Sequence, residues 1–178
     1  SSTSRGLGDV YKRQLLGQLM AAYEMNAFKD EYQRAVIENA KSFAASLKAE
    51  GLDVAGDPAV GYTETHQVIV RVGYARGPEI AKRLEENNII CNYQATPDEE
   101  GFTASGALRM GVNEMTRFGF GREQFAHLAH LIADCILRNA DVREEAARLR
   151  EGFTDMRYCF SDAETEKLIS ALAEATGI

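Results

Sequence analysis

Short β-branched segments alternate with helical segments between residues 52 and 138, and this alternation limits the possible folds more than any other feature. Val68, Val70 and Val72 recur at every second position, which is typical of a strand with one buried face. Further short strands are predicted at residues 52–55, 88–92 and 107–110. Strands this short cannot bury a face alone, so the pattern predicts an α+β fold: a small, mostly antiparallel sheet covered by helices.

Helices are predicted where apolar residues recur every three or four positions without proline, at residues 15–27, 30–50, 77–86 and 122–138. Gly51 follows the second of these segments and suits a helix stop. Pro78 stands at the start of the third, where proline fits the first turn. Long N-terminal helices are therefore expected to lead into the sheet.

The chain divides into three predicted parts. Residues 1–14 lack apolar periodicity, and residues 6–14 are similar to translated sequencing-adapter read-through, so we expect a non-native or disordered leader there. Residues 15–140 form the expected domain. Residues 141–178 are predicted to be a helical C-terminal extension, to which the sequence assigns no function.

Charge, hydropathy and cysteine spacing argue against nucleic-acid binding, membrane association and cysteine-based zinc or redox sites. The formal net charge is −7 and no long basic cluster occurs, which argues against a nucleic-acid partner. No apolar run approaches the roughly 20 residues of a membrane span, so no membrane partner is expected. Cys91, Cys135 and Cys159 lie far apart and lack zinc or redox spacing. These features predict a soluble, cytoplasmic protein with free thiols.

The histidines do not predict a metal site. His127 and His130 lie three residues apart on a predicted helix, a spacing that suits a metal, but no third ligand joins them. His66 stands just before a predicted strand, where a polar cap or packed side chain is favoured over a catalyst.

Residues 104–111 read Ala-Ser-Gly-Ala-Leu-Arg-Met-Gly and place Arg109 in an otherwise apolar strand. A guanidinium there is costly unless an anion meets it, and its planar fork of donors matches a carboxylate in a two-point contact. A substrate carboxylate is one candidate partner. A structural ion pair with one of the chain's 27 acidic residues is the other, and the residues alone leave both open.

Two further motifs accompany the segment around Arg109, which continues into Thr-Arg-Phe-Gly-Phe at residues 116–120. Residues 32–41 read Tyr-Gln-Arg-Ala-Val-Ile-Glu-Asn-Ala-Lys, and residues 63–70 read Thr-Glu-Thr-His-Gln-Val-Ile-Val. Over about residues 15–140 the chain resembles the C-terminal small domain of the serine hydroxymethyltransferases, which are fold-type I pyridoxal-phosphate enzymes.

The resemblance implies a parent enzyme that interconverts serine and glycine with pyridoxal 5'-phosphate and passes one carbon to tetrahydrofolate. It aligns Arg109 with the family's substrate-carboxylate arginine and implies structural roles near the site for His66 and Arg117. The cofactor-binding lysine, aromatic residue and phosphate loop belong to the family's large domain. No catalytic residue is therefore expected in this chain, which should be inactive alone and should partner that large domain in a homodimer or tetramer.

Residues 91–94 read Cys-Asn-Tyr-Gln, where the family often has Val-Asn-Lys-Asn ahead of its folate-contacting asparagine. Asn92 and Gln94 are thus candidates for folate or other cleft contacts, although loop hydrogen bonding is equally open. Tyr93-Gln94 in place of Lys-Asn also favours an alternative in the same family, a folate-independent β-hydroxy-amino-acid aldolase or transaldolase. A binding or oligomerisation module without chemistry is the hypothesis from another class.

Overall fold

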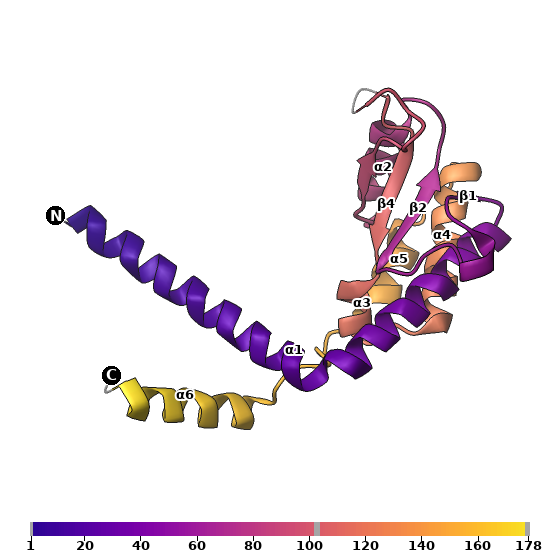
Figure 1. Ribbon diagram of the computed structural model, residues 1–178. Helices are drawn as coiled ribbons and strands as arrows, with labels where there is room; N and C mark the ends of the chain where they lie inside the picture. Colours follow the sequence, from indigo (N-terminus) through magenta and orange to yellow (C-terminus); the bar gives the residue numbers. More distant parts are fainter. Residues whose placement is uncertain (1, 102–103, 177–178) are drawn as a thin grey trace. The chain divides into compact units, whose positions relative to one another are not determined.

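The computed structural model of the chain describes residues 2–101 and 104–176 (Figure 1). The chain forms two compact units. The larger is Gln33–Arg157, and the smaller combines the segment that ends at Tyr32 with the segment that begins at Tyr158. The larger unit contains the sheet and every candidate site residue.

One antiparallel sheet of four strands, in the order β1-β2-β4-β3, organises the larger unit (Figure 1). The strands are β1 (Asp53–Val54), β2 (Gln67–Arg71), β3 (Asn92–Gln94) and β4 (Ala107–Gly111). β4 comes last in the sequence but pairs with β2 along one edge and with β3 along the other. The expected α+β fold with a small antiparallel sheet is confirmed.

Helices cover one face of this sheet. They are the C-terminal part of α1 (Ser2–Ala49), α2 (Gly77–Glu86), α3 (Asn113–Arg117), α4 (Arg122–Leu137) and α5 (Arg143–Glu151). A short 3-10 turn, η1 (Pro58–Val60), lies between β1 and β2 in the sequence. α2 contacts β3, β4 and α4, and α4 contacts α5. The core contains Phe43, Leu47, Val68, Val70, Ile80, Leu84, Leu108, Phe125 and Ile132, each at most 2% exposed.

The two N-terminal helices predicted separately form the single helix α1. Residues 28–30 contain neither glycine nor proline, so nothing in the sequence ends the helix there. The predicted stop at Gly51 is confirmed: its φ is +94°, and the N–H of Leu52 donates to the carbonyl of Leu47 (3.1 Å). The backbone of residues 2–14 is part of α1, while the division into leader, domain and extension stays a prediction.

The strand predicted at residues 88–92 is wrong in position, because β3 begins only at Asn92. Asn88 adopts a left-handed φ of +63°, and the N–H of Ile89 donates to the carbonyl of Leu84 (2.9 Å). These are features of a helix C-terminus that closes on an αL residue. Residues 87–89 therefore end α2 before the chain can extend.

The smaller unit consists of the first part of α1 and the segment around α6 (Asp162–Thr176). Aromatic pairs join them: the ring centroids of Phe28 and Phe160 lie 5.6 Å apart, and those of Tyr32 and Tyr158 lie 5.2 Å apart. These tilted pairs add to the stability that burial alone provides.

A buried amide links α1 to the turn that follows β4. The Asn39 Nδ2 atom donates to the Thr116 hydroxyl (3.0 Å) and to the carbonyl oxygen of Phe120 (2.9 Å). Asn39 is 7% exposed and Thr116 is 2% exposed, so water cannot replace these bonds. Two of the sequence motifs, at residues 32–41 and 116–120, thus meet in space and hold the end of β4.

Replacing Asn39 with alanine is expected to lower the free energy of unfolding by about 1–3 kcal/mol, because the buried Thr116 hydroxyl and Phe120 carbonyl lose their donor. Asn26→Ala, at an exposed site on the same helix, is the matched control and should be neutral or slightly stabilising. Urea denaturation measures both variants. Equal stability for the two would contradict a structural role for the Asn39 amide.

Candidate functional site

Arg109, Asn92 and Gln94 lie on the sheet face opposite the core. Directly paired residues of neighbouring strands point to the same side, and Arg109 pairs with Ile69 on β2 and with Asn92 on β3. Gln94 follows two residues after Asn92 and therefore shares this side. The structure thus brings the three predicted contact residues together on one polar face.

The Arg109 side chain is exposed, whereas its neighbours Leu108 and Met110 are buried on the other face. Within residues 2–101 and 104–176, no side chain forms a hydrogen bond or ion pair with its guanidinium. The apolar neighbours of Arg109 in the sequence predict an apolar environment, but strand alternation turns the side chain to solvent. No described residue therefore occupies its fork of N–H donors, and a ligand can bind them.

Asn92 is exposed and Gln94 is half-buried. Neither side-chain amide is bonded to another described side chain, so both can donate and accept at the open face. Tyr93, between them, points to the opposite side of β3, where it is 49% exposed at the sheet edge. Gln67 and Arg71 on β2 share this side, so the face offers two guanidinium groups and three side-chain amides.

Two contacts hold the segment just before β4: one made by the Glu99 carboxylate and one between the backbones of Gly77 and Ser105. Glu99 Oε2 accepts from the N–H groups of Thr96 (2.6 Å) and Gly106 (3.2 Å), and these bonds hold the pKa of Glu99 below its usual range. The N–H of Gly77 donates to the Ser105 carbonyl (2.8 Å), and a Cβ at Gly77 would lie 2.5 Å from that oxygen. Glycine at position 77 therefore lets the start of α2 pack against the chain just before β4.

His66 and Arg117 flank the strand that carries Arg109. The backbone carbonyl of His66 accepts from the N–H of Val112 (3.0 Å), and its exposed ring lies beside Gly111. The carbonyl of Arg117 accepts from the N–H of Arg157 (2.7 Å). These contacts involve backbone atoms only, so the structural roles that the sequence suggests for the two side chains stay predictions.

The other two histidines connect helices. His127 Nε2 lies 3.1 Å from a Glu145 oxygen, and His130 Nδ1 lies 3.2 Å from a Glu50 oxygen. Among the residues described, no group of three His, Cys, Asp or Glu side chains could hold a metal ion, and no helix is long and apolar enough to cross a membrane. Burial raises the pKa of the Cys91 thiol to about 11, which keeps that thiol protonated and unreactive near neutral pH.

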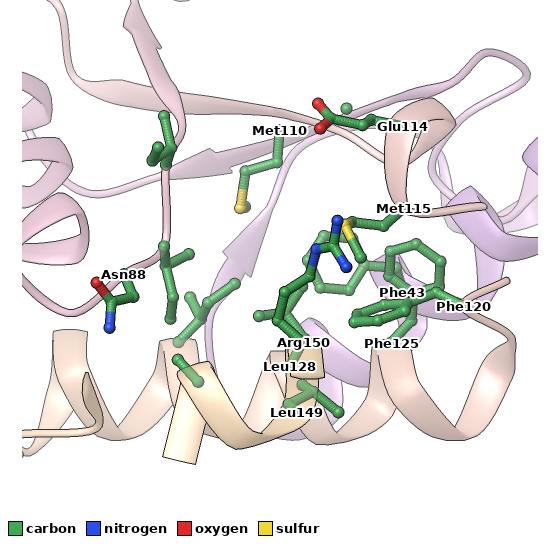
Figure 2. Close-up of a pocket in the computed structure, with 15 residues that line it drawn as sticks. Phe43, Asn88, Met110, Glu114, Met115, Phe120, Phe125, Leu128, Leu149 and Arg150 are labelled. Carbon is green, nitrogen blue, oxygen red and sulfur yellow. The ribbon is translucent and has the colours of Figure 1, made fainter. Parts of the chain in front are cut away.

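A cavity of about 390 Å³ lies elsewhere, between β4, α4 and α5 (Figure 2). Met110 lines it, so it belongs to the helix-covered side of the sheet and not to the face of Arg109. Glu114 and Arg150 are its charged residues, and neither is among the contact residues predicted from the sequence. Leu149 and Arg150 are neighbours on α5, where five of the other seven residues are charged, so the sequence pattern of this helix does not indicate a cavity wall.

The chain matches known proteins over the region that contains the sheet. The family described as serine hydroxymethyltransferase matches residues 17–132. A serine hydroxymethyltransferase from Pyrobaculum arsenaticum is 39% identical over 77% of this chain and 32% of its own length. One from Sulfolobus acidocaldarius is 34% identical over 85% of this chain and 36% of its own.

A solved structure, that of L-threonine transaldolase from Pseudomonas fluorescens, matches with a TM-score of 0.73 and 29% identity. The match covers 87% of this chain and 36% of that protein. The chain thus spans about a third of the length of the relatives it matches. The matched region holds the motifs, the sheet and Arg109, and the chain belongs to the serine hydroxymethyltransferase family.

Proposed function

We propose that this chain is the C-terminal part of a pyridoxal-phosphate-dependent hydroxymethyltransferase that interconverts serine and glycine and transfers one carbon to tetrahydrofolate. The observation that carries the proposal is the guanidinium of Arg109, exposed and without a described partner, on the central strand of a family-matched domain. Its chemistry fits the carboxylate that serine and glycine share.

The residues on the open face fit a role toward the substrate better than a role in holding the cofactor. Arg109 and Asn92 are exposed, so this face by itself cannot exclude water from a reaction. A second surface, the family's large domain on the same polypeptide, is needed to cover it and to hold most of the pyridoxal phosphate. When bound, that cofactor supplies the electron sink. We assign no catalytic residue to this chain and expect the fragment alone to be inactive.

Arg109 would orient the substrate. A two-point contact between its guanidinium and the substrate carboxylate fixes the rotation of the amino acid about its α-carbon. That orientation would select which bond at the α-carbon is presented to the cofactor when it is bound. Asn92 and Gln94, on the neighbouring strand, can donate to or accept from a polar edge of folate or substrate.

The exposed surface of α1 supports further partners. Leu15, Leu16, Leu19 and Tyr23 are each 40–61% exposed on its N-terminal part. Apolar side chains that recur along one helix and face water mark a contact surface. We propose that the large domain or a second subunit covers them. The complete protein would then be a cytoplasmic homodimer or tetramer that binds serine, glycine or a related amino acid. No nucleic-acid or membrane partner is proposed.

A folate-independent aldolase or transaldolase acting on β-hydroxy amino acids is the second candidate. The structural match to an enzyme called L-threonine transaldolase favours it, as does Tyr93-Gln94 in place of Lys-Asn. The relatives named serine hydroxymethyltransferase favour the first candidate. A non-catalytic binding or oligomerisation module has weaker support, because the relatives and the solved structure that match this chain are named as enzymes.

Arg109→Ala in the full-length parent is expected to weaken serine binding about a hundredfold, because a charge-assisted two-point contact is worth roughly 3 kcal/mol. The melting temperature should not change, since the side chain is exposed and has no described partner. Arg109→Lys should recover little affinity, because an ammonium lacks the fork. Serine titrations followed by cofactor absorbance, with melting curves alongside, measure these effects.

Arg71→Ala is the matched control, because Arg71 is an exposed arginine on the same face of the adjacent strand. Its loss should leave serine affinity within a few-fold. If Arg109→Ala lowers the melting temperature and leaves serine affinity almost unchanged, Arg109 is a structural residue and the proposed clamp is wrong.

The folate-independent candidate predicts that the enzyme cleaves a second class of substrate. We expect the full-length parent to cleave a 3-hydroxy amino acid other than serine without tetrahydrofolate, and to retain some folate-dependent serine turnover, because Gln94 occupies the region of the family's folate-contacting asparagine. Aldehyde release from threonine and from serine, with and without tetrahydrofolate, measures this. Strictly folate-dependent turnover of serine alone would show that the replacement has no functional effect.

A further inference from the structure

The cavity between β4, α4 and α5 plays no part in the proposed function. Its volume of about 390 Å³ lies within the range of small-molecule sites. It opens on the helix-covered side of the sheet, away from Arg109. Its walls are mostly large apolar side chains, among them Phe43, Met110, Met115, Phe120, Leu128 and Leu149.

Arg150 provides the cation of this cavity. Its guanidinium stacks 4.5 Å from the centre of the Phe118 ring and donates from Nη1 to the carbonyl of Phe153, which holds its plane in place. No Asp or Glu in the described part of the chain lies within ion-pair distance of it. A guanidinium has five N–H donors, so these two contacts leave most of them available.

Figure 2 shows the Arg150 side chain extending from α5 toward Met115, with the rings of Phe120 and Phe125 beside it. Glu114 lies at another rim of the cavity, on α3, and its side chain is exposed. Water therefore screens the charge of Glu114 more strongly than that of the half-buried Arg150. The cavity thus combines apolar walls with a cation that has no ion-pair partner among the described residues.

We propose that this cavity binds a small amphipathic monocarboxylate with an aromatic or branched aliphatic body. The body would lie among the apolar walls, where removal of its surface from water favours binding. The carboxylate would meet Arg150, which a neutral ligand would leave without a counter-charge. A second carboxylate would have to enter the apolar walls or face Glu114, so dicarboxylates are disfavoured.

The test uses 4-phenylbutyrate as the probe and the full 178-residue chain as the protein. Isothermal titration should give a saturable dissociation constant on the order of 1 mM or tighter. The neutral counterpart 4-phenylbutanamide should bind at least about tenfold more weakly, because it cannot form the charge-assisted contact. Equal binding of acid and amide, or no binding of the acid, would overturn the proposal.

Three variants locate the site. Arg150→Gln should weaken binding of 4-phenylbutyrate about tenfold or more, and Leu149→Trp should abolish it by filling the cavity. Arg148→Gln is the matched control, because Arg148 lies on the same helix but its side chain is 64% exposed and pairs with Glu144. Undiminished binding in a folded Arg150→Gln or Leu149→Trp chain refutes the site. If Arg150→Gln fails to fold, Leu149→Trp and the comparison of acid with amide decide the question.

Discussion

The position of β4 at the centre of the sheet is the constraint on which the rest of the larger unit depends. Hydrogen-bonded pairing along both edges fixes its register, and register fixes which side chains turn inward. Leu108 and Met110 therefore enter the core, and Arg109 faces outward. A slip of one residue would bury the guanidinium and expose the two apolar side chains, so core packing and site geometry support each other.

Contacts at the two ends of β4 maintain this register. At its start, Glu99 accepts from the Gly106 N–H, and Gly77 allows α2 to approach the Ser105 carbonyl. At its end, Asn39 binds the turn through Thr116 and the Phe120 carbonyl. Residues far from Arg109 in sequence thus position it, which explains why the family motifs include buried polar residues as well as site residues.

Most of the sheet and of the amphipathic helices was predictable, because periodicity and glycine stops act locally. Val68 and Val70 indicated the buried face of β2, and the apolar residues around Arg109 predicted a strand at residues 107–110. The start of β3 was missed because Asn88 ends α2 in a left-handed conformation that no apolar pattern reveals. The cavity was missed for a different reason: it exists only where β4 and the helices α3, α4 and α5 come together, and no single segment of the sequence encodes that arrangement.

The sequence also placed Arg109 correctly on a strand but could not say whether it faces the core or solvent, since that depends on pairing with β2 and β3. The most direct measurement of the central claim is a crystal structure of the full-length parent with glycine bound. The account predicts both carboxylate oxygens at about 2.7–2.9 Å from two nitrogens of the Arg109 guanidinium. Glycine bound with its carboxylate on another cation, and Arg109 paired with an acidic side chain of the protein, would contradict it.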